Sequence, residues 1–163
     1  MDFFAVYAQV SISWAAFTGI VATLRQAGGI KFTREQYVMF RFFTEGSLVL
    51  LMVAMVAMMI LQATTDKELA ARLLCIYTTL SLITYVPFHV VRRIKSRISM
   101  VLFSKLVVVG YAILTSIFLI SLTDYLWQPS FILVQTVLLY GLATNSVIFF
   151  IFISSYVQVE GEL

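Results

Sequence analysis

Long runs of hydrophobic residues fill almost the whole chain, and only short polar segments separate them. Each run approaches or exceeds the ~20 residues that a helix needs to cross the ~30 Å hydrocarbon core of a bilayer. The runs are continuous rather than alternating, which favours helices over the strands of a barrel. We therefore predict an all-α integral membrane protein, a bundle of five transmembrane helices in a single transmembrane domain, 1–163. The predicted spans are 4–24, 37–62, 69–92, 100–122 and 130–157.

The composition agrees with this pattern and argues against a soluble fold. Hydrophobic residues make up 61% of the chain and charged residues 12%, about half the ~25% that is usual in soluble domains. A chain of this length could not bury so much apolar surface if water surrounded it. The segments between the spans are too short to hold a soluble catalytic domain.

Basic residues lie mainly on one side of the predicted bundle, with only Lys67 and Arg72 on the other. Because cytoplasmic loops are enriched in Lys and Arg, we predict that the N-terminus is outside and the C-terminus is cytoplasmic, in a bacterial inner (plasma) membrane. This placement accounts for the net charge of +3, so membrane lipids are expected partners and nucleic acid is not. The basic residues on the cytoplasmic side are Arg25, Lys31, Arg34, Arg41, Arg92, Arg93, Lys95, Arg97 and Lys105.

Two short segments have the sequence of a helix start. Gln36 follows Thr33 at the spacing of a capping box, in which each side chain bonds the backbone N–H of the other residue. We therefore predict that the second helix begins just after Thr33 and is longer than the bilayer core is thick. Thr65 and Glu68 have the same spacing, which predicts a second capping box at the start of the third helix.

A cluster of ionisable residues is expected near the cytoplasmic end of the spans. Glu45 lies one helical turn beyond Arg41, about 6 Å deeper in the membrane. A carboxylate at that depth must be paired, protonated or hydrated, and Arg41 and Lys105 are its candidate partners. His89, the only histidine, lies near the same end and is expected to form a hydrogen bond close to the headgroups rather than to bind a metal.

Two interpretations of Glu45 stay open. It is either half of a structural ion pair that fixes the second span to the fourth, or a proton or cation site at the inner mouth of a transport pathway. The first interpretation predicts that losing the carboxylate lowers stability. The second predicts that it changes flux.

Small residues recur at every fourth position of the first span. Small side chains on one side of a transmembrane helix let another helix approach closely, so this pattern predicts a packing face. The face could be used within the subunit or between subunits, and we slightly favour the first. Its members are Ser11, Ala15, Gly19 and Thr23.

Polar residues also recur along the fifth span. Polar groups at membrane depth need partners or water, so the pattern has two interpretations. The first is hydrogen bonding between helices, worth only ~0.6 kcal/mol per contact on average. The second is the lining of a narrow pore, with Asn145 at the constriction. The residues concerned are Gln135, Thr136, Tyr140, Gly141, Thr144 and Asn145.

The function classes that remain do not include catalysis. The sequence has no phosphate-binding glycine loop, no cluster of metal ligands and no nucleophile–base set, so we expect neither an enzyme nor a cofactor. We favour a homo-oligomeric ion channel or small-solute permease lined by the fifth span. The alternative is a non-catalytic accessory or assembly subunit of a larger membrane protein complex. A pore lining must face water whereas a packing stripe must be covered by helices, so the surroundings of the fifth span distinguish the two.

Overall fold

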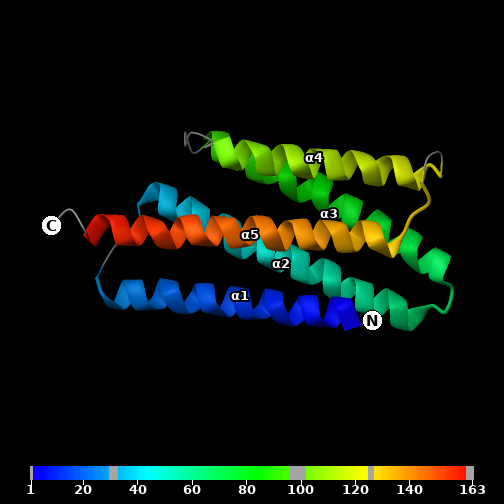
Figure 1. Ribbon diagram of the computed structural model, residues 1–163, viewed down its shortest axis with the longest axis horizontal. Coiled ribbons are helices and arrows are strands. Elements are labelled where there is room, and N and C mark those ends of the chain that lie inside the picture. The colour runs from blue at the N-terminus through cyan, green and yellow to red at the C-terminus, as the bar shows by residue number, and fades with distance from the viewer. Residues whose placement is uncertain (1, 30–32, 96–101, 125–126, 161–163) are drawn as a thin grey trace.

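The described part of the chain folds into five long helices. The computed structural model describes residues 2–29, 33–95, 102–124 and 127–160. Each helix is long and apolar enough to cross a membrane, which confirms the prediction of an all-α chain with five helices of this kind. Lys31, Arg97 and residues 100–101 of the predicted fourth span lie outside the described residues. The helices are α1 (Asp2–Ala27), α2 (Arg34–Ala63), α3 (Lys67–Lys95), α4 (Leu102–Leu122) and α5 (Phe131–Glu160) (Figure 1).

Helices that follow one another in the chain run in opposite directions along one long axis, so α1 begins at one end of the bundle and α5 finishes at the other (Figure 1). Each of the first four helices packs against the next one along the chain, and α5 packs against α2, α3 and α4. We call the end of the bundle where α2 begins and α3 finishes the basic end, because the last turn of α3 contains Arg92, Arg93 and Lys95. The other end holds the ion pair between Arg72 and Asp124.

Local sequence determines where the helices begin and end. The capping box at Thr33 is confirmed, since the Gln36 amide donates to the Thr33 hydroxyl at 3.2 Å and the Thr33 amide donates to Gln36 Oε1 at 3.1 Å. Gly29, with φ of +74°, takes the left-handed conformation that lets the chain turn after α1.

The predicted second capping box, at Thr65, is wrong by one residue. The Asp66 carboxylate accepts hydrogen bonds from the amides of Glu68, at 2.9 Å, and Leu69, at 3.2 Å. Asp66 is therefore the residue that caps α3. A carboxylate at this position also interacts favourably with the positive end of the helix dipole, which a threonine hydroxyl does not.

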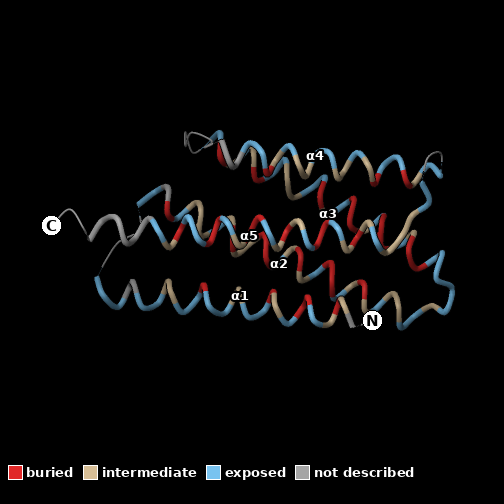
Figure 2. Tube along the Cα trace, in the orientation of Figure 1, coloured by how far each residue is buried: buried red, intermediate tan, exposed pale blue. Residues whose placement is uncertain are grey.

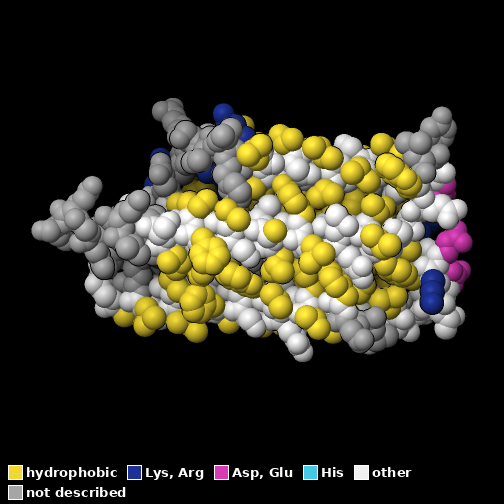
Figure 3. Space-filling view, in the orientation of Figure 1, with side chains coloured by type: hydrophobic (Ala, Val, Ile, Leu, Met, Phe, Trp, Pro, Cys, Tyr) yellow, Lys and Arg dark blue, Asp and Glu magenta, His cyan; other side chains and the backbone are white. Residues whose placement is uncertain are grey.

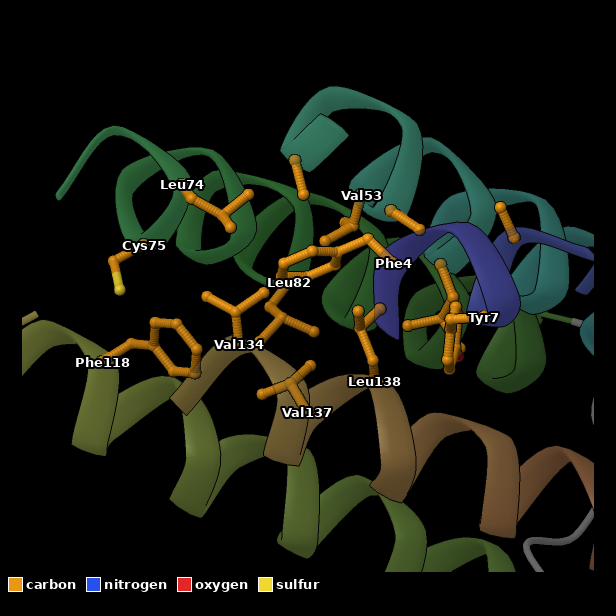
Figure 4. Packing of buried hydrophobic residues seen from close by; sticks show 14 residues of the cluster. Phe4, Tyr7, Val53, Leu74, Cys75, Leu82, Phe118, Val134, Val137 and Leu138 are labelled. Carbon is orange, nitrogen blue, oxygen red and sulfur yellow. The ribbon is translucent and has the colours of Figure 1, made fainter. Parts of the chain in front are cut away.

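The core of the bundle is built from all five helices (Figure 4). Phe4 of α1, Val53 of α2, Leu74 of α3, Phe118 of α4 and Val137 of α5 meet there, each almost completely buried. Cys75, the only cysteine, also lies in this cluster and is buried and free. Packing rather than chemistry accounts for the side chains at this level of the bundle.

The outside of the bundle is apolar. Large hydrophobic side chains are strongly exposed on every helix, for example Leu24 at 67%, Phe150 at 67% and Ile132 at 72%. Figure 2 shows buried positions mainly where helices face one another, and Figure 3 shows hydrophobic side chains between charged groups at the two ends. Such a surface requires lipid or another apolar chain around it.

The small-residue stripe of α1 is covered only at its beginning. Ser11 is buried and Ala15 is half-buried, whereas Gly19 and Thr23 are exposed. Positions four apart advance by about 400°, so the stripe turns roughly 40° further round the helix at each step. Within this subunit the stripe is therefore covered at Ser11 and uncovered at Gly19 and Thr23, and its use between subunits stays a prediction.

The packed side of α1 uses larger residues at mixed spacings of three and four. Tyr7 and Ala8 are buried beside Phe4, and Thr18 follows further along. Trp14 stacks edge-on against Phe149 of α5 at 4.9 Å between ring centroids. Aromatic contacts therefore hold the middle of α1 against the bundle.

Candidate functional site

Glu45 lies at the centre of an ion cluster between α2 and α3. The Arg92 guanidinium donates to both carboxylate oxygens, with 2.9 Å from Nη1 to Oε1. Arg41, one turn before Glu45 on α2, donates from Nε to Oε1 at 2.5 Å. The Glu45 side chain is 28% exposed, so its bidentate ion pair with Arg92 is partly buried.

Arg41 is thus confirmed as a partner of Glu45, and the predicted pairing with Lys105 is wrong. Lys105 is on α4, which packs against α3 and α5, and its side chain is exposed. The partner from another helix is instead Arg92 of α3, the helix that packs against both α2 and α4. The ion pair fixes α2 to α3 rather than to α4.

Arg92 is the member of this ion cluster that the sequence pattern did not single out. The sequence pattern identifies it only as one of the basic residues on the cytoplasmic side, and the structure places it within α3, which continues as far as Lys95. Its guanidinium lies 4.9 Å from the ring centroid of Phe88, one turn earlier on the same helix. This cation–π contact and the pair with Glu45 together hold the arginine in place.

His89 is packed among aromatic rings at the same level. It is 5% exposed, and its ring centroid is 4.0 Å from that of Phe42 on α2. Its Nδ1 atom has no hydrogen-bond partner among the described residues. His89 also helps to line a pocket of about 180 Å³.

Arginines form most of the charged wall of this pocket, which we call the basic pocket. It lies at the basic end, between the first turns of α2 and the last turns of α3. Because Glu45 pairs with Arg41 and Arg92, it offsets part of their positive charge. The ionisable lining residues are Arg34, Tyr37, Arg41, His89, Arg92 and Arg93.

The half of the polar stripe on α5 that lies nearer the basic end is covered by other helices of the same subunit. Asn145 is 6% exposed and donates from Nδ2 to the Ser47 hydroxyl of α2 at 3.2 Å. Thr144 is also buried, and its hydroxyl donates to the Gly141 carbonyl of its own helix at 3.0 Å. These two residues make packing and hydrogen-bond contacts inside the bundle.

Gly141 marks a close approach of α2 and α4 to α5. A Cβ atom at this position would overlap the Leu50 side chain of α2 and come within 3.1 Å of the Tyr111 hydroxyl of α4. Tyr140, the preceding residue, donates from its hydroxyl to the Val107 carbonyl of α4 at 3.2 Å. Glycine is therefore required here for packing.

The part of the stripe that lies nearer the other end of the bundle has a different environment. Thr136 is exposed, and its hydroxyl donates to the Ile132 carbonyl one turn earlier at 2.8 Å. Gln135 is half-buried. The six polar positions therefore do not share one environment, because steps of four and five residues carry them round the helix.

Metal chemistry and family relationships add nothing to these contacts. Across the described residues, no group of three or more His, Cys, Asp and Glu side chains could hold a metal ion. Comparisons with models of protein families, with curated proteins and with solved structures find no match to this chain.

Replacing Glu45 tests whether the cluster stabilises the bundle. We expect Glu45→Gln to lower the free energy of unfolding by about 1–3 kcal/mol, between the values for exposed and buried pairs, because Arg92 loses its partner. The measurement is unfolding from mild detergent into SDS. A double-mutant cycle with Arg92→Gln should give a coupling energy above about 0.5 kcal/mol. Lys105→Gln is the control. A coupling energy between Glu45 and Lys105 that is larger than the coupling energy between Glu45 and Arg92 would contradict the pairing with Arg92.

Replacing Gly141 tests the close approach of α5 to its neighbours. We expect Gly141→Leu to lower the free energy of unfolding by about 1–3 kcal/mol, because the added side chain overlaps Leu50. The matched control is Gly19→Leu, since a Cβ atom at Gly19 meets nothing within 4 Å. The same SDS titration compares them, and equal losses for the two variants would contradict the packing at Gly141.

Proposed function

We propose that this chain is a non-catalytic accessory or assembly subunit of a larger membrane protein complex. The observation that carries the proposal is that part of the polar stripe of α5 is covered by other helices. Its buried members, Gly141, Thr144 and Asn145, are used in contacts with helices of the same subunit. This is the arrangement expected of a helix-packing stripe.

A channel or permease lined by α5 receives less support from the same geometry. Ions need a path in which polar groups replace part of their hydration. The Asn145 amide, the residue expected at the constriction, is instead paired with Ser47 and buried. A homo-oligomeric pore would have to use other surfaces of the bundle, so we prefer the accessory-subunit proposal.

The proposal includes an orientation in the membrane. The basic end contains Arg34, Arg92, Arg93 and Lys95, and cytoplasmic segments are the ones enriched in such residues. We therefore place the basic end and the C-terminus in the cytoplasm and the N-terminus outside, in a bacterial inner membrane. The cluster around Glu45 then lies near the inner leaflet.

Contact with a partner chain is easiest to test at the uncovered part of α1. Gly19 and Thr23 are exposed, and the surroundings of Gly19 are empty to 4 Å. A glycine on the outside of a transmembrane helix allows a second helix to approach closely. A larger side chain there would separate two chains without disturbing the inside of this one.

Native mass spectrometry of the particle extracted in mild detergent tests this proposal. We expect one copy of the chain in a defined ratio with an unrelated membrane chain. Gly19→Leu should reduce that complex at least about tenfold, since loss of ~1.4 kcal/mol of helix contact has this effect, while Gly19→Ala should retain it. A particle that contains only copies of this chain and conducts ions in a planar bilayer would overturn the proposal.

A further inference from the structure

One side of α2 changes from basic to apolar along its length. Its members follow at alternating steps of four and three residues, which keeps them on one face of a helix. This face points away from α5, because Met52 lies about 200° round the helix from Leu50, the residue that contacts Gly141. The members of this face are Arg34, Val38, Arg41, Glu45, Leu48 and Met52.

The apolar half of this face borders a groove between α2 and α3 of about 690 Å³. Leu48 and Met52 on α2 and Leu80 and Phe88 on α3 are among its lining residues, and all four are exposed. The Thr84 hydroxyl in the groove donates to the Leu80 carbonyl of its own helix at 2.7 Å. The groove therefore suits a hydrocarbon chain better than a polar ligand.

The basic half of the face leads into the basic pocket. Arg92 connects the two spaces, because it lines the pocket while its guanidinium covers the ring of Phe88, which lines the groove. Arg34 and Arg41 line the pocket from α2. Guanidinium groups match the geometry of phosphate oxygens, to which they donate paired hydrogen bonds.

His89 adds a second observation that points to a ligand in this pocket. The His89 side chain is almost completely buried, with 5% of its surface exposed, and its Nδ1 atom has no hydrogen-bond partner among the described residues. His89 is one of the residues that line the pocket, and an imidazole N–H is a group that can donate a hydrogen bond to an anionic oxygen. A buried polar atom without a partner is costly, and a bound anion would satisfy it.

We propose that the face formed by α2 and α3 binds one anionic phospholipid. Its phosphate occupies the basic pocket near Arg34, Arg41 and Arg92, and one acyl chain lies in the groove along Met52 and Phe88. A soluble anion would leave the groove unused, and a zwitterionic lipid would leave the arginines without net compensation. Basic pockets between transmembrane helices on the cytoplasmic side are suited to anionic headgroups.

The test is native mass spectrometry of lipids retained by the intact protein. The probes are phosphatidylglycerol and phosphatidylcholine with the same acyl chains, added in equal amounts to protein stripped of lipid in detergent. We expect preferential retention of phosphatidylglycerol. Arg34→Gln should weaken that retention about fivefold, the effect of one basic side chain beside an anionic headgroup.

The matched control is Lys67→Gln, which removes a basic residue from the first turn of α3 at the other end of the bundle. Arg34 and Lys67 are both exposed, so neither change disturbs the core. Equal retention of the two lipids by the unmodified protein would overturn the proposal. Equal weakening by Arg34→Gln and Lys67→Gln would overturn it too, because the attraction would then be spread over the surface.

A second variant separates a lipid from a soluble anion. Thr84→Trp fills the groove from an exposed position and leaves the basic pocket intact. We expect it to reduce phosphatidylglycerol retention at least fivefold, roughly the effect of 1 kcal/mol. Inorganic phosphate should fail to displace the lipid from the unmodified protein. Unchanged retention by Thr84→Trp, or displacement by phosphate, would show that the pocket takes a soluble anion and would overturn the proposal.

Discussion

The structure depends on one constraint, that polar groups inside a hydrocarbon layer cannot be satisfied by water. Hydroxyl groups in the described helices illustrate how the chain meets it. Those of Thr78 and Thr79, both buried in α3, donate to carbonyls one turn earlier at 2.8 and 2.7 Å. Asn145 has no such local option and uses Ser47 on another helix instead. Polar residues in the spans therefore become contacts within the chain.

The same constraint explains the ion cluster. A carboxylate in α2 would be costly alone, and two arginines from two helices compensate it. This fixes α2 beside α3 at the basic end, through the face of α2 that α5 leaves uncovered. The uncovered face carries both the apolar groove and the basic pocket. Stability of the pair and availability of a lipid-sized site therefore follow from one arrangement of helices.

Much of the fold could be predicted because it depends on local sequence. The five helices follow from the length of the apolar runs, and the start of α2 follows from Thr33 and Gln36, which are three residues apart. The pairing of Arg41 with Glu45 is also local, since one helical turn separates them. Each of these features is determined by residues that are neighbours in the chain.

The parts that could not be predicted depend on which helices are neighbours in space. Arg92 replaces Lys105 as the partner of Glu45 because α3, not α4, packs against α2. The spacing of Gly19 and of Asn145 suggested faces, but a spacing of four drifts round the helix and does not say what covers it. Only the packed structure distinguishes Gly19, which is open, from Asn145, which is buried.

The central claim is that the buried polar positions of α5 contact other helices and not water. It can be tested with a single cysteine. Cys75 is the only native cysteine, so Asn145→Cys in a Cys75→Ala background carries one thiol. Lys67→Cys in the same background is the exposed control. A membrane-impermeant maleimide, added to either side of the membrane, should label the control and leave the thiol at position 145 unmodified. Labelling at position 145 at a rate similar to that of the control would place it in water and contradict the account.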